Sequence, residues 1–300
     1  MKNKIPQLIT LIILGSFIAS CDYVKNVNPP AEPTNGGGTA TNVFVTDSTI
    51  GSNPLQQKVL IEDYTGHKCA NCPAAADELV AIEIAHPGNI VPVAVHAGFF
   101  AKTNLTYPTS FTTTVGNTFD GTFGNSAAGN PNGLINRIGV PTTTQIKLYT
   151  AWSTEVTQLL AHTPKFQILI KYKYETGTLK LDANVTVKSL ANNTGTYKLV
   201  LLLTQDSIIA EQDDNRATPS FISNYKFDHV LRGAINSDWG DAVFTTGAPI
   251  NAIELKSFTN YQINASFKPS KCHIVAYVYD ADVASPTHYE VLQVEEIKLK

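Results

Sequence analysis

The sequence has few of the residues that mark several common classes of binding protein. Only one methionine and two tryptophans occur among 300 residues, so nothing indicates a Met-rich groove or an aromatic cage. Lysine and arginine number 22 against 25 acidic residues, and the pI is near 6.2, so we expect no nucleic-acid partner. A composition of 43% hydrophobic residues nevertheless suffices for sizeable cores, and the length favours two domains.

An apolar run stands at the N-terminus. Lys2 and Lys4 precede LITLIILGSFIA (8–19), which has the length of a signal-peptide core and is too short to span a bilayer comfortably. The run ends in IASC, which resembles a bacterial lipoprotein box; an ordinary secretory signal is the alternative. We predict a signal peptide over 1–20 and a lipid at Cys21 that attaches the mature protein to a membrane surface.

The segment that follows is poor in large apolar residues and rich in Asn, Pro, Thr and Gly. We predict that residues 21–53 form a lipid-anchored flexible tether. The triplet Asp47-Ser48-Thr49 resembles the acceptor that Bacteroidetes use for O-glycosylation, which makes Ser48 a candidate site. Secretion also places the mature chain where disulfides persist.

The first folded unit is expected over 54–163. Within it, the sequence predicts a strand over 58–64, a helix over 72–86 that follows the spacing of its apolar residues, and a buried strand over 89–98. Cys69 and Cys72 lie at the start of the helix. Strand, helix and strand in this order indicate a parallel βαβ arrangement.

A cysteine at a helix N-terminus lies at the positive end of the helix dipole, which stabilises the thiolate. Lys68 favours the thiolate too, and His67 does so when it is protonated. Lowering a thiol pKa from ~8.5 to ~7 raises the thiolate fraction at pH 7 from about 3% to about half. We expect Cys69 to be the more exposed and attacking sulfur, because Cys72 lies within the first helical turn.

These residues resemble the thioredoxin superfamily, in which a strand leads to Cys-x-x-Cys at the start of a helix. In that family a buried acidic residue six positions before the first cysteine relays protons, and Asp63 holds this position. The resemblance also implies a cis-proline that faces the disulfide, for which Pro131 is the candidate; an ordinary turn proline is the alternative. His67 and Lys68 replace the usual tryptophan, which leaves the reaction direction and substrate docking open.

Two further segments complete the first unit. Residues 99–129 are rich in aromatic, Thr and Gly residues and almost uncharged, which predicts a long insertion that either shapes a binding surface or is simply packed. Apolar residues at helical spacing over 144–162 predict a helix that closes the domain.

From residue 164 the period changes to that of strands. We predict that 164–300 form an all-β antiparallel sandwich, immunoglobulin-like or jelly-roll-like, with a helix allowed only over 211–224. The acidic run 211–214 is expected to be a solvated loop, and His229 a surface or interface residue. Cys272 alternates with apolar residues and is expected to be a free thiol in the core.

Together, the lipoprotein signal, the tether, EDYTGHKCANCP (62–73), GLINR (133–137) and HVLRG (229–233) are similar to the twenty-eight-kilodalton outer-membrane protein family of the Bacteroidetes. The resemblance covers nearly all of the chain from about residue 55. It implies an outer-membrane lipoprotein of the cell envelope with two folded domains. It implies no particular reaction, although adhesion has been suggested for such proteins.

Three functions from different classes remain open. In the first, the protein catalyses thiol–disulfide exchange on envelope proteins: Cys69 attacks, Cys72 resolves, and Asp63 moves the proton. In the second, the sandwich binds a partner, and Cys69–Cys72 is a structural disulfide. In the third, the cysteines with His67 or His96 hold a soft metal, although four-cysteine and HxxxH spacings are absent. We expect the first, since a structural disulfide does not require Asp63, and we expect no cofactor.

Overall fold

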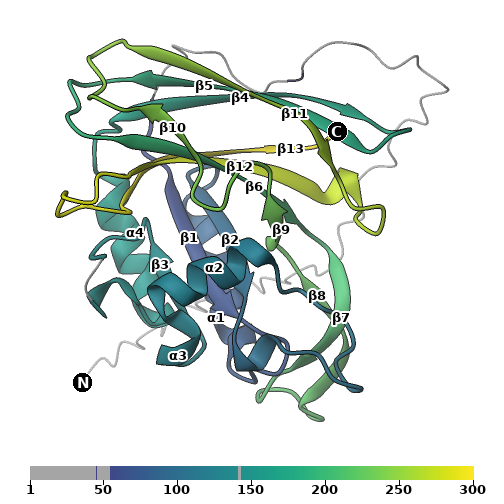
Figure 1. Ribbon diagram of the computed structural model, residues 1–300. Helices are drawn as coiled ribbons and strands as arrows, with labels where there is room; N and C mark the ends of the chain where they lie inside the picture. The colour runs from purple at the N-terminus through teal and green to yellow at the C-terminus, as the bar shows by residue number, and fades with distance from the viewer. Residues whose placement is uncertain (1–44, 46–54, 141–142) are drawn as a thin grey trace, which may run out of the picture. The chain divides into compact units, whose positions relative to one another are not determined.

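The computed structural model of the protein describes residue 45 and residues 55–140 and 143–300, which lie in one compact unit that begins at residue 42 (Figure 1). The predicted signal peptide, Cys21 and Ser48 lie outside the described residues. Val45, within the predicted tether, pairs with Tyr172 through backbone hydrogen bonds of 2.7 and 3.0 Å. Among the described residues, no helix is long and apolar enough to cross a membrane.

A parallel strand–helix–strand unit follows, as the sequence pattern predicts. β1 (Val59–Thr65) and β2 (Ile90–His96) are parallel neighbours, and α1 (Cys72–Ala85) connects them. Every residue of both strands is buried, which is typical of parallel strands covered on both faces and explains their largely apolar sequences. Pro73 occupies the first turn of α1, where its missing N–H leaves no helical hydrogen bond unmade.

Residues 99–129 contain helices, although their composition predicts a long loop. They form η1 (Phe99–Ala101), α2 (Thr114–Phe123) and α3 (Asn125–Ala128). In α2 the buried residues Val115, Phe119 and Phe123 recur every four positions, and the Thr113 hydroxyl caps the helix by accepting a 3.0 Å backbone hydrogen bond. Threonine and glycine are poor helix formers, so a segment rich in them is not expected to be helical from its composition. The helical spacing of its apolar residues was therefore missed.

β3 (Asn132–Ile135) is antiparallel to β1 and lies on the opposite side of it from β2. The predicted closing helix is present but shorter than expected: α4 (Trp152–Leu160), preceded by η2 (Thr143–Gln145) and η3 (Tyr149–Ala151). α4 packs beside α1 against β1, with Trp152 in their shared core. The two helices therefore cover one face of this part of the sheet.

Strands then follow, as predicted for the rest of the chain. They are β4 (Phe166–Glu175), β5 (Lys180–Ser189), β6 (Tyr197–Gln205), β7 (Ile208–Asp213), β8 (Phe221–Phe227), β9 (Val230–Ala234), β10 (Asp241–Phe244), β11 (Ile253–Gln262), β12 (Cys272–Asp280) and β13 (Val291–Lys298), with η4 (Pro269–Lys271) before β12. β4, β5 and β11 form a three-stranded antiparallel sheet, and β7 and β8 form a separate hairpin. The helix allowed over 211–224 is therefore absent, because these residues belong to the hairpin.

One eight-stranded sheet contains strands from both predicted domains. Its order is β13-β12-β6-β9-β2-β1-β3, with β10 also paired to β6. β9 makes the connection, since it pairs in parallel with β2 at Ala94 and Val230 and antiparallel with β6. Strands before and after the predicted boundary at residue 163 thus share one sheet within one compact unit. The fold is mostly β, with mixed and antiparallel sheets and few helices.

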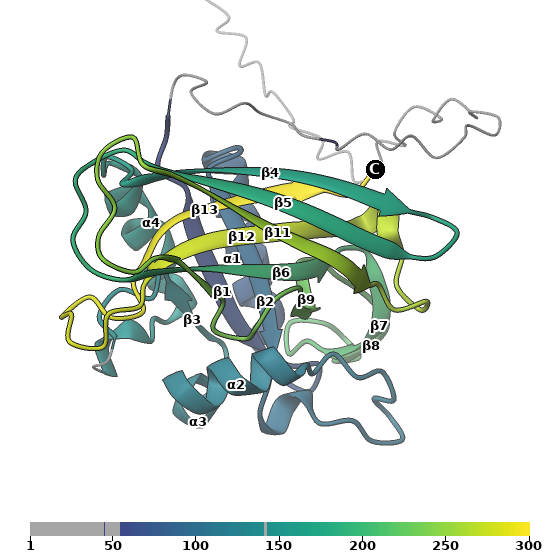
Figure 2. The same cartoon turned by 45° about the horizontal axis from the view of Figure 1, so that its top comes forward.

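The two large sheets pack face to face (Figure 2). β4, β5 and β11 cover β6, β12 and β13, and apolar side chains of both sheets fill the space between them. Cys272 lies in this core with Ile274 and Ala276, which confirms the predicted buried free thiol. Burial raises the pKa of Cys272 to about 12, so this thiol is unreactive near neutral pH.

A buried ion pair lies at the opposite face of the eight-stranded sheet. Arg137 and Glu62 side chains are both 0% exposed, and Nε and Nη2 of Arg137 donate to the two Glu62 carboxylate oxygens at 2.7 Å each. Nη2 also donates to Tyr277 Oη of β12 at 2.8 Å, and the guanidinium lies 4.5 Å from the centre of the Phe119 ring. Although burial lowers the pKa of Arg137, the Glu62 carboxylate raises it well above its ordinary value, so the arginine stays charged.

Two glycine substitutions are expected to have opposite effects on stability. A Cβ at Gly133 would lie 2.6 Å from Trp152 Cζ2 and 2.8 Å from a backbone oxygen, so Gly133→Ala is expected to lower the free energy of unfolding by about 1–3 kcal/mol. At Gly121, an exposed position of α2, nothing lies within 4 Å, so Gly121→Ala is expected to raise it by up to about 1 kcal/mol. Urea denaturation measures both; equal destabilisation would contradict the close contact of Trp152 with Gly133.

Candidate functional site

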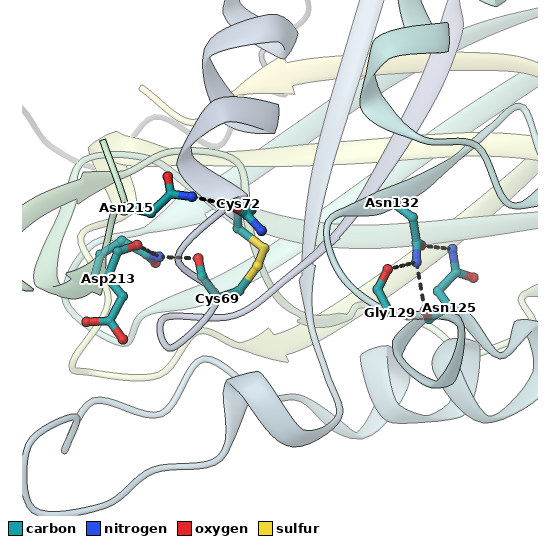
Figure 3. Close-up of a disulfide and its surroundings, with 9 residues drawn as sticks. Cys69, Cys72, Asn125, Gly129, Asn132, Asp213 and Asn215 are labelled. Atoms are coloured by element: carbon teal, nitrogen blue, oxygen red, sulfur yellow. Dashed lines mark hydrogen bonds between the residues drawn. A yellow bond between two sulfur atoms is a disulfide. The ribbon is translucent and has the colours of Figure 1, made fainter. Parts of the chain in front are cut away.

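Cys69 and Cys72 form a disulfide at the start of α1, with their Cα atoms 5.3 Å apart (Figure 3). Cys72 is the first residue of α1 and Asn71 its N-cap, so the positive end of the helix dipole lies at the disulfide. Both cysteines are only 2% exposed. The expectation that Cys69 is the more exposed sulfur is therefore wrong, because two other segments of the chain cover the disulfide loop, residues 67–70.

The segment that follows β2 covers one side of this loop. The backbone N–H of Lys68 donates to Phe100 O at 3.1 Å, and a His67 ring nitrogen lies 3.2 Å from Lys102 O. The His67 ring also stacks on Tyr107, with the ring centres 5.2 Å apart. Burial lowers the pKa of His67, so the ring is neutral near pH 7 and does not supply the positive charge that its protonated form would give the thiolate.

The end of the β7–β8 hairpin covers the other side. We call residues 212–216 the hairpin tip. The backbone N–H groups of Asp213 and Asn215 donate to His67 O and Ala70 O at 2.9 and 3.0 Å. The two donors are two residues apart, whereas the two acceptors are three residues apart in a turn, so the contact is not a β ladder. The tip therefore lies against the disulfide loop, on the side where Asp213 and Asn215 are seen next to Cys69 and Cys72 (Figure 3).

Side chains of the tip extend this contact. The buried Gln212 amide donates to Cys69 O at 3.0 Å, and Arg216 forms an ion pair of 2.7 Å with Asp77 of α1. The Arg216 and Asp77 side chains are 46% and 70% exposed, so solvent screens their attraction. The Tyr107 hydroxyl also donates to Asp213, and the Asn215 amide donates to Asn71. A hydrogen bond contributes a net ~0.5–1.5 kcal/mol, so these polar contacts together are the main attachment of the tip.

The base of the hairpin is held differently. Its inward side chains join an apolar cluster made by Phe111, Ala210, Phe227 and Val230. Fully burying a large apolar side chain contributes about 1.5–3 kcal/mol, more than one hydrogen bond does. The tip is therefore held by several polar contacts and the base by apolar burial.

Sequence reasoning did not find this hairpin. It assigned the acidic run 211–214 to a solvated loop, whereas these residues form the end of β7 and the following turn. The available signal was weak: Ala210 and Gln212 are buried, and the residues between and after them are half-buried. A polar Gln at a buried strand position is easily read as part of a loop.

Asp63 lies on the face of β1 that packs against α1. Ile61 and Val59, two and four residues earlier, contact α1 side chains, and alternate residues of a strand point to the same side. Asp63 is 3% exposed, and its Oδ1 has no hydrogen-bond partner among the described residues. Burial raises the pKa of Asp63 to about 7, and the charge of His229 opposes this shift. The carboxyl therefore exchanges its proton near neutral pH.

The start of α1 lies above this carboxyl. In a parallel strand–helix unit the helix begins at the carboxyl end of the first strand, which is where Asp63 lies. Burial raises the pKa of Tyr225 in β8, and the carboxylates of Asp77 in α1 and of Asp63 raise it further. Asp63 therefore lies on the α1 side of the sheet, near the end of the strand that leads to the disulfide.

The peptide bond before Pro131 is cis. Pro131 directly precedes β3, whose first residue, Asn132, pairs with β1 near the carboxyl end of that strand. Pro131 is therefore at the end of the sheet from which the chain leads to the disulfide. The Asn132 amide fixes the turn before Pro131 by donating to the backbone oxygens of Asn125 and Gly129 at 2.8 Å each (Figure 3).

A row of alternating carboxylates and imidazoles connects α1 to β9, β12 and β13. His229 lies 3.3 Å from Glu83 and 3.6 Å from Asp206, and His273 lies 3.1 Å from Asp206 and 3.4 Å from Glu296. Although burial lowers both histidine pKa values, the carboxylates raise that of His229 and bring that of His273 to about 9. The His273 ring therefore carries positive charge near pH 7, and the row holds α1 on the sheet. Sequence reasoning had placed His229 at a surface or interface.

The geometry does not support the alternative that the cysteines and a histidine hold a soft metal. Within the part of the chain that the structure describes, no group of three or more His, Cys, Asp or Glu side chains could hold a metal ion. His96, one of the expected ligands, packs against the rings of Phe111 and Phe227, with ring centres 4.8 and 5.6 Å away. Burial lowers the pKa of His96 to about 3.

Known proteins resemble this chain over most of its length. The model of the family described as outer membrane protein Omp28 matches residues 117–300. Among solved structures, HBP35 of Porphyromonas gingivalis has a TM-score of 0.63 at 17% identity, and the match covers 83% of this chain and 77% of that chain. A protein from Agrobacterium tumefaciens has a TM-score of 0.46 at 13% identity, covering 82% and 96%. No curated protein matches the chain. The likeness to HBP35 shows a shared fold.

Proposed function

Because this chain belongs to the outer membrane protein Omp28 family, and so is located in the outer membrane of the cell envelope, we propose that it performs thiol–disulfide exchange on envelope polypeptides. In this proposal residues 54–163 act as a thioredoxin-like domain, and the strands of 164–300, as an immunoglobulin-like or jelly-roll-like sandwich, support it. A lipid on Cys21 holds the protein at the membrane, and Ser48 in the tether carries a glycan.

The observation that carries the proposal is the buried Asp63, near the end of the strand that leads to the disulfide. A structural disulfide needs no titratable group near it, and a buried carboxyl without a hydrogen-bond partner destabilises the fold. A carboxyl with a pKa of about 7 is suited to giving a proton to a leaving thiolate and taking it back near neutral pH.

The exchange begins with the oxidised pair that the structure contains. A thiolate of a polypeptide dithiol attacks Sγ of Cys69, the Cys69–Cys72 bond breaks, and Cys72 leaves as a thiolate that takes the proton of Asp63. The second thiol of the polypeptide then loses its proton, and its sulfur displaces Cys69 from the mixed disulfide. The polypeptide is oxidised by two electrons to a disulfide, and the Cys69/Cys72 pair is reduced by two.

The alternative is a binding or adhesion protein in which Cys69–Cys72 only stabilises the fold. The observation in its favour is the 2% exposure of both cysteines, which keeps thiols away from the sulfurs. That role leaves the position and the raised pKa of Asp63 without a purpose.

Asp63→Asn is expected to slow the oxidation of a peptide dithiol by about 100-fold at pH 6, because the variant has no proton to give to the leaving Cys72 thiolate. Protonated Asp63 predominates below its pKa of about 7. The ratio of the wild-type rate to the variant rate should therefore fall as the pH rises through 7. The measurement is a single-turnover reaction of the oxidised full chain with a reduced peptide, followed by mass spectrometry.

Glu155→Gln, which removes a surface carboxylate of α4, is the matched control and should react as the wild type does. Cys69→Ser should not react. A titration of the disulfide against glutathione separates the two functions. A potential below about −300 mV, the range of structural disulfides, with no oxidation of the peptide would assign the pair a structural role.

A further inference from the structure

The hairpin tip is seated on the disulfide loop in the way that a bound peptide would be. The donors at Asp213 and Asn215 are two residues apart and face the carbonyls of His67 and Ala70. N–H groups two residues apart point to the same side of an extended segment, so such a segment can reach both carbonyls, which are three residues apart in a turn.

We propose that the disulfide loop, residues 67–70, is a docking edge for an extended polypeptide, and that the hairpin tip occupies this edge until it lifts. The inference rests on the proposed exchange function. A partner takes the place of the tip by donating its own backbone N–H groups to His67 O and Ala70 O. The same movement opens the path to the sulfurs of Cys69 and Cys72.

Three features allow the tip to lift while the core stays intact. In the described sheets, β7 and β8 pair only with each other, so lifting breaks no ladder of the large sheets. The apolar cluster lies at the base of the hairpin, and one ring contact of the hairpin is described beside the tip, that of Phe221 with Tyr107, with ring centres 5.8 Å apart. The outermost contact, the ion pair of Arg216 with Asp77, is largely in solvent. Segments held in this way open locally without global unfolding.

The contacts that the tip leaves behind define the kind of partner. Lifting removes the donors of two carbonyl oxygens, those of His67 and Ala70, whereas Cys69 O keeps the backbone N–H of Cys72 as a donor. A partner gains most where it supplies N–H groups at a spacing of two residues, since acceptors without donors are unfavourable. An extended polypeptide has this spacing, and a small thiol does not. The partner is therefore an unfolded, thiol-bearing segment of a polypeptide.

The first test measures how fast dithiothreitol reduces the disulfide in the full chain. The double variant Gln212→Ala/Arg216→Ala loses two side-chain contacts of the tip and is expected to react about tenfold faster than the wild type. Lys226→Ala breaks an ion pair elsewhere on the hairpin and should react at the wild-type rate. Equal rates in all three chains would overturn the proposal.

The second test uses a synthetic peptide with the sequence of residues 208–217, IIAEQDDNRA. It should return the reduction rate of the double variant toward the wild-type rate, and leave the wild type unchanged because the tip already occupies the edge. The control peptide is N-methylated at the positions of Asp213 and Asn215, so it lacks the two donors. If both peptides protect equally, or neither protects, the loop is not a docking edge.

A third measurement does not depend on variants that fold. In the wild type, the amide hydrogens of Asp213 and Asn215 should exchange with solvent faster than that of Val275, which lies in the core strand β12. Exchange of all three amide hydrogens at the rate of global unfolding would contradict the proposal that the hairpin tip lifts. If the tip lifts and the peptide binds, but even the double variant oxidises no polypeptide, the proposed function fails and this inference stands.

Discussion

Arg137→Met is expected to lower the free energy of unfolding by about 3–5 kcal/mol, because it leaves the buried Glu62 carboxylate without its partner. Both Glu62 oxygens accept hydrogen bonds from Arg137, and both side chains are 0% exposed, so water cannot replace the guanidinium. Methionine keeps most of the volume, which makes the loss mainly electrostatic. Urea denaturation at pH 7 without reductant measures it.

Two further variants separate charge from packing. Glu62→Gln/Arg137→Met removes both charges and should recover most of the lost stability. Lys147→Met breaks a partly exposed ion pair with Glu155 and is expected to cost at most about 1 kcal/mol. If Arg137→Met cost no more than Lys147→Met, the buried pair would have no special part in stabilising the sheet.

Asp63→Asn is expected to be increasingly more stable than the wild type as the pH rises from 4 to 8. The folded pKa of Asp63, about 7, lies above its ordinary value of 3.8, so between these values the native state binds more protons than the unfolded state. The favourable contribution of the protonated carboxyl is complete below pH 3.8 and is lost as the pH rises through 7. Three pKa units at 1.36 kcal/mol each give a change of about 4 kcal/mol.

The measurement is urea denaturation of the oxidised variant and wild type at pH 4, 5.5 and 8, with the difference taken at each pH. Other titrating groups, including His229 and His273, are present in both chains and largely cancel. Glu155→Gln should differ from the wild type by a constant amount at all three values. A constant difference for Asp63→Asn would show that Asp63 ionises as an exposed carboxyl does.

The elements next to the disulfide were predictable because their signals are local. An apolar strand, a proline in the first helical turn and apolar residues at helical spacing lie within 30 residues of one another, and the structure confirms β1, α1 and β2. Asp63 and Pro131 were found by resemblance to thioredoxins. The structure buries Asp63 and places a cis bond at Pro131, while their part in a reaction stays a prediction.

What local patterns could not predict is the environment of the cysteines. Gln212 and Cys69 are separated by 143 residues, and no periodicity connects them. A strand–helix–strand motif predicts where a disulfide lies in a fold, but exposure depends on what packs over it later in the chain. The same reasoning explains the sheet: apolar strands predicted separately for each half contained no sign that β9 would join them.

The strand β9 also determines whether the two halves of the chain can be separated from each other. In a chain cut at residue 163, the buried strand β2 would keep β1 but lose β9, which pairs with it at Ala94, and the row of N–H and C=O groups on that side would be uncovered. Such rows recruit other chains, so neither half is suited to an independent existence or to transfer between proteins as a module. The segment with the two cysteines and the strands of the second half are therefore expected to fold, and to be inherited, as a single unit.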